Sequence, residues 1–163
     1  MRKVIISSPA ATIGTCADNG ILFSFAAGIP VEVANATDSL GGTAKLKSIS
    51  FVANTSGASP AVDVFFFKKS ANLGTRNSVP DASQAAAAAA HCLGKVHFPS
   101  VDEGESIFVT DAANNEKYVS VKNNVDLIVE SDENSQSIYY IGIAREAVNV
   151  AFVGDFRIIF GFE

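Results

Sequence analysis

The chain is organised as a series of short apolar runs in which Val, Ile, Phe and Tyr alternate with polar residues. Clusters of Gly, Asn, Asp, Ser and Pro separate the runs, a spacing that is typical of all-β sandwiches and barrels. The sequence predicts eleven strands, which is more than one small sheet holds, so we expect two packed antiparallel sheets. The strands are expected at residues 3–7, 20–27, 30–34, 45–54, 61–69, 94–98, 106–110, 117–122, 126–131, 137–145 and 156–162.

The run AVDVFFFKK places apolar side chains on both faces of one strand. By alternation, Val64 and Phe66 share one face with Val62. The opposite face carries Phe65 and Phe67. This strand is therefore either central and covered on both sides, or its outer face meets another subunit.

A second pattern, KYVSVKNNVDLIVES, contains two alternating runs separated by two asparagines. Asparagine tolerates left-handed backbone, which tight turns require. The step Asn123–Asn124 therefore predicts a hairpin turn between two strands.

One short Ala-rich helix is predicted in the stretch SQAAAAAAHCLGKVHF, residues 83–98. Pro80 and Asp81 supply a helix start, alanine has the highest helix propensity, and Gly94 stands where a helix can end. The helix should span about ten to twelve residues. Because its alanine flank lacks a polar face, we expect it to lie flat against a sheet or a neighbour. A bulky replacement such as Ala87→Leu should then damage packing.

The length of 163 residues fits one domain around one hydrophobic core. We expect an N-terminal strand or arm at residues 1–8 and a single β-sandwich domain over residues 9–163. The start MRKVIISSPAATIGTC is similar to a lipoprotein signal, but its apolar run VII is shorter than the roughly 7 residues that an export signal needs. No apolar run approaches the roughly 18 residues that cross a bilayer, so no membrane partner is expected.

The amount and sign of charge indicate which classes of partner the chain can bind. Charged residues make up 18% of the chain, whereas about 25% is typical, and a charge-poor surface often contacts other proteins. The net charge of −5 argues against nucleic acid as a partner. Residues 1–100 carry eight Lys or Arg and five Asp or Glu, and residues 101–163 carry four and twelve. This asymmetry either helps identical subunits associate or is a solvated acidic surface.

The histidines and cysteines do not predict a chemical site. Cys16 and Cys92 neighbour small apolar residues and are expected to be buried free thiols in a reducing cytoplasm. His91, Cys92 and His97 fall short of the four closely spaced ligands of structural zinc. No GxSxG or GxxxxGK[ST] motif is present. We expect no enzyme activity, no cofactor and no metal.

Three alternative functional hypotheses remain open. Acidic clusters at residues 102–105 and 130–133 could ligate calcium, although neither has the spacing of an EF-hand loop. A carbohydrate- or receptor-binding module, such as a fibre tip, would need an aromatic groove around Tyr139 or Tyr140. A small enzyme of the cupin kind would gather both histidines inside one cavity.

Several stretches together resemble a known family. They are AKLKSISFVANTSGASPAVDVFFFKKS, AAAAHCLGKVHF, DAANNEKYVSVKNN and the terminal IYYIGIAREAV with FRIIFGFE. Their layout, from about residue 31 to residue 163, is similar to the small jelly-roll capsid decoration, or cement, proteins of tailed bacteriophages. The resemblance implies an antiparallel jelly-roll-like β-sandwich, commonly a homotrimer, bound to the major capsid protein on the virion surface.

The candidate contact residues lie in the terminal segments, the phenylalanine run and the tyrosine pair. The terminal segments MRKVIISS and FRIIFGFE are strand-like and can pair or pack outside their own domain. Residues 2–8 are expected to act as an arm that fastens neighbouring shell subunits in an assembly formed in the host cytoplasm. The predicted interface consists of Arg2, Lys3, Val4, Ile5, Ile6, Phe65, Phe67, Tyr139, Phe160 and Phe162.

Overall fold

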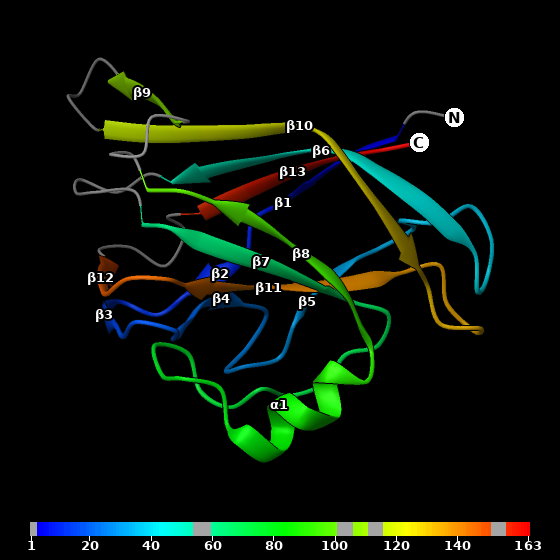
Figure 1. Ribbon diagram of the computed structural model, residues 1–163, viewed down its shortest axis with the longest axis horizontal. Helices are drawn as coiled ribbons and strands as arrows, with labels where there is room; N and C mark the ends of the chain where they lie inside the picture. The colour runs from blue at the N-terminus through cyan, green and yellow to red at the C-terminus, as the bar shows by residue number, and fades with distance from the viewer. Residues whose placement is uncertain (1–2, 54–59, 101–105, 111–115, 151–155) are drawn as a thin grey trace.

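The structure, a computed structural model, describes residues 3–53, 60–100, 106–110, 116–150 and 156–163 (Figure 1). These residues form mostly strands and one helix. The elements are β1 (Lys3–Ser7), β2 (Ala10–Ala11), β3 (Gly14–Cys16), β4 (Ile21–Ser24), β5 (Val31–Val33), β6 (Thr43–Ala53), β7 (Val62–Phe67), α1 (Ala82–Ala89), β8 (Cys92–Phe98), β9 (Ser106–Thr110), β10 (Glu116–Glu130), β11 (Ile138–Ala144), β12 (Val148–Val150) and β13 (Phe156–Phe162).

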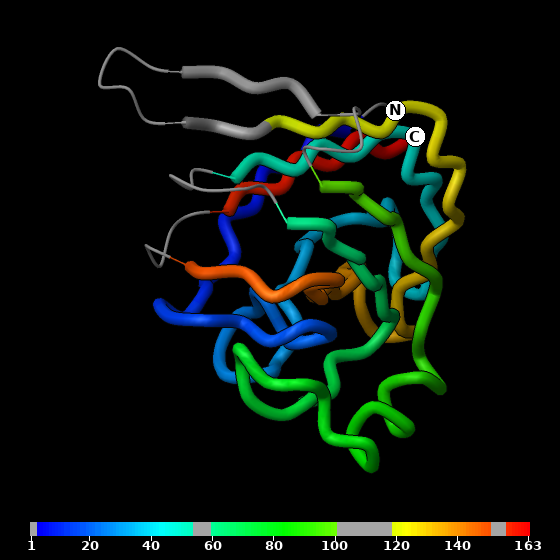
Figure 2. Tube along the Cα trace, turned by 60° about the vertical axis from the view of Figure 1, so that its left-hand side comes forward, coloured from blue at the N-terminus to red at the C-terminus, as the bar shows by residue number. Residues whose placement is uncertain are grey.

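Two antiparallel sheets face each other, as Figures 1 and 2 show. The first sheet has the strand order β1-β13-β6-β10-β9. The second has the order β2-β4-β11-β7-β8, and β5 also pairs with β11. Strands β3 and β12 form a small separate ribbon. The expectation of two packed antiparallel sheets is confirmed.

The pairing of the eight principal strands defines a jelly roll. In chain order these strands are β1, β4, β6, β7, β8, β10, β11 and β13. The first pairs with the last, the second with the seventh, the third with the sixth, and the fourth with the fifth. Such nested pairing is one long hairpin wrapped across two sheets, which is the jelly-roll arrangement. The predicted jelly-roll-like sandwich is therefore confirmed.

Aromatic rings dominate the core between the sheets. The ring centroids of Phe51 and Phe156 lie 5.7 Å apart, and that of Phe23 lies 5.4 Å from Phe156. The fully buried Tyr140 donates its hydroxyl hydrogen to Ser7 Oγ at 2.6 Å, which ties β11 to β1 in the opposite sheet. Burial raises the pKa of Tyr140 well above its ordinary value, so the hydroxyl stays a donor.

Two of the predicted interface residues belong to this core. Phe160 and Phe162 lie on the inward face of β13 with exposed fractions of 0% and 2%. They alternate with Arg157 and Ile159, whose side chains lie on the opposite face of the strand. The prediction that these phenylalanines present an external contact is corrected, because strand alternation buries them.

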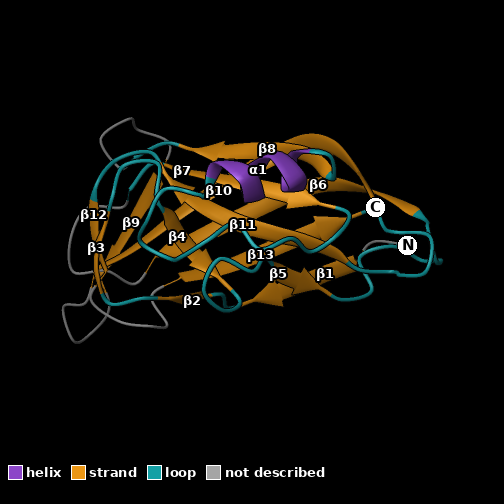
Figure 3. Cartoon of the chain, turned by 90° about the horizontal axis from the view of Figure 1, so that it is seen from below, coloured by secondary structure: helices purple, strands orange, loops and turns teal. Residues whose placement is uncertain are grey.

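Strand β7 is covered on both sides, as its sequence suggested. Val64 and Phe66 face the main core, whereas Phe67 is buried in a second apolar cluster on the outer side of the sheet. Helix α1 covers this cluster and contributes Ala88 to it. Figure 3 shows α1 lying across this face of the second sheet. The predicted interface residue Phe67 therefore packs in this cluster beneath α1.

The predicted hairpin at Asn123–Asn124 is wrong. Strand β10 continues through this step and pairs with the unbroken strand β6, with a register shift between Asn123 and Leu127. Asn124 and Asp126 have φ angles of 56° and 55°, so the left-handed backbone expected there does occur. It forms a β-bulge within one long strand instead of a turn between two.

Helix α1 begins as predicted and ends earlier. Asp81 caps it by accepting hydrogen bonds from the backbone N–H groups of Ser83 and Gln84. The helix has 8 residues, and β8 starts at Cys92, so Cys92 is not helical. Gly94 is not the helix stop. It lies inside β8 at φ 143°, where a Cβ atom would be 2.8 Å from Leu127 Cδ1.

The two cysteines differ in environment. Both are free thiols. Cys16 is buried, and this burial raises its pKa to about 11. Cys92 is exposed at the start of β8. The expectation of buried thiols is confirmed for Cys16 and wrong for Cys92.

Helix α1 offers a direct test of which face packs against the sheet. Ala88 is 1% exposed, whereas its neighbour Ala87 is exposed. The packing damage expected of Ala87→Leu therefore does not apply at that position. Ala88→Asp buries an unpaired carboxylate and should lower the free energy of unfolding by at least about 2 kcal/mol, measured by urea denaturation. Ala87→Asp is the control and should change it by less than about 0.5 kcal/mol. Equal losses would contradict this packing.

Candidate interaction surface

The outer face of the first sheet is an apolar feature that the described fold leaves open. In Figure 1, α1 lies beneath the other sheet, and no described helix or strand lies over this one. The outward residues of four adjacent strands align in rows, one of which runs from Ile6 through Ile159 and Ser50 to Val121. We call this surface the open sheet face. Its apolar members are Val4, Ile6, Val52, Val119, Val121 and Ile159.

This face carries apolar residues at solvent-exposed positions, where polar residues are usual. Antiparallel sheets with one solvated face usually alternate apolar inward and polar outward residues. Here Val4, Ile6 and Val121 are 61%, 63% and 43% exposed. The charged residue in the same rows is Arg157, paired with Val52. A group of exposed apolar side chains on one sheet face is typical of a protein contact surface.

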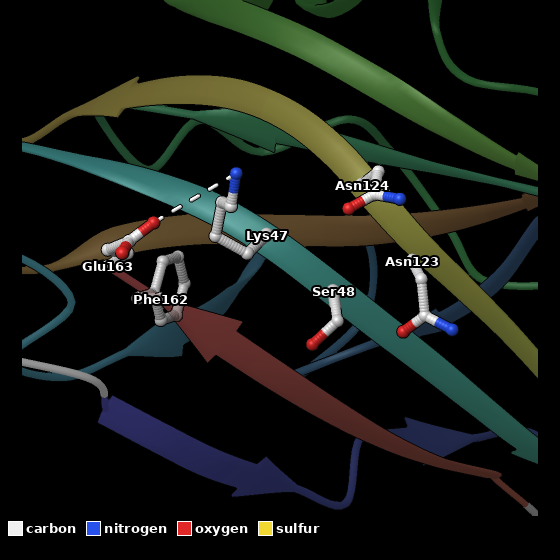
Figure 4. Close-up of a pocket in the computed structure, with 6 residues that line it drawn as sticks. All are labelled: Lys47, Ser48, Asn123, Asn124, Phe162 and Glu163. Carbon is white, nitrogen blue, oxygen red and sulfur yellow. Dashed lines mark ion pairs between the residues drawn. The ribbon is translucent and has the colours of Figure 1, made fainter.

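A shallow hollow of about 250 Å³ interrupts one end of the open sheet face (Figure 4). It lies beside the β10 bulge, where Asn123 and Asn124 of β10 are next to Ser48 of β6. Gly161 of β13 pairs with Ser48, and a Cβ atom on Gly161 would meet the Ser48 hydroxyl oxygen. The hollow and the bulge together give the face a shape that a flat sheet would lack.

Charged groups surround this hollow. Lys47 Nζ lies 2.8 Å from Asp126 Oδ1 and 3.9 Å from Glu163 Oε2, and Lys45 Nζ lies 3.1 Å from the same Asp126 oxygen. Hydrogen bonds from Lys47 and Lys45 lower the pKa of Asp126. The hydrogen bond with Asp126 raises the pKa of Lys47. These ion pairs form a polar rim at the end of an apolar face.

The outer face of the second sheet carries a different cluster, centred on Asp63. This carboxylate is 1% exposed, yet it lies in the middle of the apolar strand β7. Arg145 Nη2 is 2.7 Å from Asp63 Oδ2, His97 Nδ1 is 2.7 Å from Oδ1, and Lys95 also contacts Oδ2. Arg145 and Lys95 both lie over the Phe65 ring, at 5.8 and 5.7 Å from its centroid.

The partners of Asp63 decide its charge. Burial by itself would raise the pKa of Asp63, but hydrogen bonds from Lys95, His97 and Arg145 outweigh burial and lower it. Asp63 is therefore ionised at neutral pH and holds Arg145 and Lys95 over Phe65. The sequence carried one signal for this cluster, a lone acidic residue inside the apolar run AVDVFFF.

The N-terminal part of the predicted interface is a sheet edge, not a free arm. Arg2 lies outside the described residues, and Lys3 donates to Asn35 O at 2.6 Å and to Asp38 at 3.1 Å. Ile5 packs against the core. Val4 and Ile6 project from β1 onto the open sheet face. Of the terminal residues predicted, these two place their side chains where a partner could contact them.

The aromatic part of the prediction is distributed over separate places. Phe65 is half-buried beneath the Asp63 cluster, and Tyr139 is partly buried with a pKa raised chiefly by burial. Tyr140 lies in the core. The adjacent tyrosines therefore do not share one exposed aromatic groove, because Tyr140 is buried and Tyr139 is partly buried.

The histidines are also apart. His97 binds Asp63 on the outside of the second sheet, and His91 follows α1, where its backbone N–H donates to Ala88 O at 2.9 Å. Within the described residues, no three His, Cys, Asp or Glu side chains are grouped as metal ligands. The acidic cluster at residues 102–105 lies outside the described part of the chain. Of the helices described, none is long and apolar enough to span a membrane.

Comparison with known proteins gives similarity in structure alone. No protein-family model matches the chain, and no curated protein matches it. A chain from the X-ray structure of tomato aspermy virus is similar over 99% of this chain and 75% of that chain, at 8% identity and a TM-score of 0.39. A chain from the semi-empty virus-like particle of the giant freshwater prawn Macrobrachium rosenbergii nodavirus is similar over 99% and 91%, at 10% identity and a TM-score of 0.33. A chain from Desmodium yellow mottle tymovirus is similar over 99% and 79%, at 12% identity and a TM-score of 0.30. The jelly-roll assignment rests on the strand order of this chain.

Proposed function

We propose that this chain is a non-enzymatic structural protein of a virus particle, a decoration or cement protein that binds the major capsid protein through the open sheet face. The observation that carries the proposal is the row of exposed apolar side chains on that face. Burying Val4, Ile6 and Val121 against another protein would remove apolar surface from water, which is the main favourable term in protein association.

The position of β1 at the edge of the first sheet also supports the open sheet face as the binding surface. An edge strand offers unpaired backbone groups to another chain, and proteins usually protect such edges with charges or proline. In β1 the central residues Val4, Ile5 and Ile6 provide neither. A partner on the open sheet face could therefore also contact this edge.

We propose a homotrimer on the capsid surface, assembled in the host cytoplasm. Three copies held together would each present one open sheet face to the shell. Once one copy is bound, the second and third contacts become effectively intramolecular, so modest contacts combine into tight retention. The low charge of the chain is consistent with a protein that meets other proteins on more than one side.

The test replaces an open-face residue without disturbing the fold. Ile6→Lys places a charge in the centre of the apolar row, and we expect retention on shells assembled from the major capsid protein to fall at least about tenfold. Retention is measured by co-sedimentation of purified chain with shells over a concentration series. A point substitution is a better test than deletion of residues 1–8, because β1 pairs with β13 and its loss would damage the sheet.

Leu40→Lys is the matched control, because Leu40 is 65% exposed, close to the 63% of Ile6, and lies on the β5–β6 connection away from the rows of the open face. It should retain shell binding. Wild-type chain that ignores the shells, or Ile6→Lys that binds as well as wild type, would overturn the proposal.

A further inference from the structure

An apolar recess lies on the opposite side of the molecule, between α1 and the second sheet. It has a volume of about 200 Å³ and opens to solvent. Apart from the thiol of Cys92, every residue that lines it is apolar. The main lining residues are Phe65, Phe67, Leu73, Ala85, Ile141 and Ile143.

The recess exists because the helix is made of alanine. Ala85 and Ala88 point from α1 toward the sheet, where they meet the second apolar cluster. A methyl group is too short to fill the space between a helix backbone and the large side chains of β7 and β11. Protein interiors normally close such gaps, since unfilled apolar volume costs contact energy. The site therefore lacks one apolar group of moderate size.

The chain itself displays a side chain of this kind. Phe25 is 68% exposed and lies on the β4–β5 connection. Its backbone N–H donates to Ile29 O at 2.8 Å, and Ile29 N–H donates to Ala26 O at 2.8 Å, so the connection is a fixed turn. Gly28 in this turn packs so closely on Gly74 that a Cβ atom would lie 2.6 Å from its backbone. An exposed phenylalanine on a fixed turn is an effective binding anchor, because little freedom is lost when it is buried.

The size of the ring matches the recess. An apolar cavity of about 150 Å³ takes up benzene, and this recess is about 200 Å³. Phe25 cannot be filling it within its own chain, because its turn is fixed with the ring in solvent. The two features nevertheless lie on neighbouring segments, since Leu73 N–H donates to Gly28 O at 2.9 Å.

We propose that Phe25 of one copy inserts into the recess beneath α1 of a second copy. The contact is a plug and a socket carried by the same chain, so copies join through two different patches and can close into a ring. It gives the proposed homo-oligomer a specific contact and leaves the open sheet face free for the shell. It does not depend on shell binding, because purified chain alone should show it.

The experiment measures the mass of the purified chain in solution by light scattering after size-exclusion chromatography, over a dilution series. Wild type should have a multiple of the 17.0 kDa chain mass. Phe25→Ser removes the plug and Ala85→Leu fills the socket. Each should raise the dissociation constant at least about thirtyfold and shift the mass toward one chain.

Two matched controls separate this contact from general damage. Leu40→Ser removes another exposed apolar side chain, 65% exposed, and Ala87→Leu makes the same replacement on the exposed side of α1. Both should keep the wild-type mass. All variants should keep the wild-type melting temperature within a few degrees, or exceed it in the case of Ala85→Leu, whose leucine fills an apolar space.

Complementation gives the decisive outcome. The Phe25→Ser chain keeps its socket and the Ala85→Leu chain keeps its plug, so a mixture should form pairs that neither variant forms alone. A monomeric wild type, or an oligomer whose mass neither substitution changes, overturns the inference. Either result leaves the Ile6→Lys shell assay to be decided separately, so the two proposals fail independently.

Discussion

Gly142→Ala is expected to lower the free energy of unfolding by about 3 kcal/mol, at the upper end of what overpacking costs. Gly142 lies on the inward side of β11, opposite Phe23 of β4. A Cβ atom built on Gly142 would overlap three ring carbons of Phe23. The ring cannot move aside easily, because Phe51 and Phe156 pack against it with centroids 6.0 and 5.4 Å away. Chemical denaturation followed by circular dichroism measures the loss.

Gly161→Ala is the control for this prediction. Its added Cβ would meet the hydroxyl oxygen of Ser48, which can rotate away on the solvent side of the sheet. The expected loss is below about 1 kcal/mol. In the Gly142→Ala background, Phe23→Leu should cost less than it does in wild type, because a smaller side chain relieves the overlap. Equal losses at both glycines would show that Phe23 does not pack over Gly142.

The alternation of apolar and polar residues determines most of this fold. The predicted strands at residues 3–7, 106–110 and 156–162 match β1, β9 and β13 to the residue. Strands β2, β3 and β12, of two or three residues each, were not predicted. Such short strands have no periodicity of their own, and their pairing is set by the chain around them.

Local signals could not distinguish a bulge from a turn in β10. Two adjacent asparagines indicate left-handed backbone, and both a β-bulge and a hairpin turn contain such backbone. The deciding fact is non-local, because β6 runs unbroken for 11 residues and pairs with both halves of β10. This bulge also produces the hollow at the end of the open sheet face, so part of the candidate surface was invisible to sequence reasoning.

The sequence did contain the signal that would have corrected part of the predicted interface. In FRIIFGF, alternation alone puts Phe160 and Phe162 on the same face as Phe156 and Ile158. Four large apolar residues on one face indicate a core strand. By the same rule, Ile159 belongs to the opposite face, where the structure places it on the open sheet face.

The cluster around Asp63 depended on strand register. Lys95 and His97 lie on the same face of β8, and His97 stands directly opposite Asp63 of β7. Arg145 follows β11, the other neighbour of β7. Three strands must be paired in this register before the charges meet, and no local pattern specifies it.

Asp63→Asn is expected to lower the free energy of unfolding at pH 7 by about 2 kcal/mol. The substitution removes the charge that Arg145, Lys95 and His97 share. This loss is smaller than the roughly 3–5 kcal/mol for breaking a fully buried ion pair, because the partners are 31%, 51% and 50% exposed and regain water. Urea denaturation at neutral pH measures the loss.

The same carboxylate gives a sign for the pH dependence of stability. The pKa of Asp63 is lower in the folded chain than its ordinary value, because hydrogen bonds from its three partners outweigh burial. The stability it supplies is therefore complete above the unfolded-state pKa of about 3.9 and is lost as the pH falls through the lower folded-state value. Between about pH 5 and pH 2, the unfolding free energy of wild type should decrease more steeply than that of Asp63→Asn, so the two curves converge.

Asp126→Asn is the comparison that shows how much of the Asp63→Asn stability loss depends on burial of the carboxylate. Asp126 also has a lowered pKa and two lysine partners, but its side chain is 51% exposed. Water and salt screen such a pair, and asparagine tolerates the left-handed backbone at this position. We expect Asp126→Asn to change stability much less than Asp63→Asn, and 0.5 M salt to reduce the Asp126 effect more than the Asp63 effect. Comparable losses at the two sites would mean that Asp63 is solvated and that the cluster does not fix Arg145 and Lys95 over Phe65.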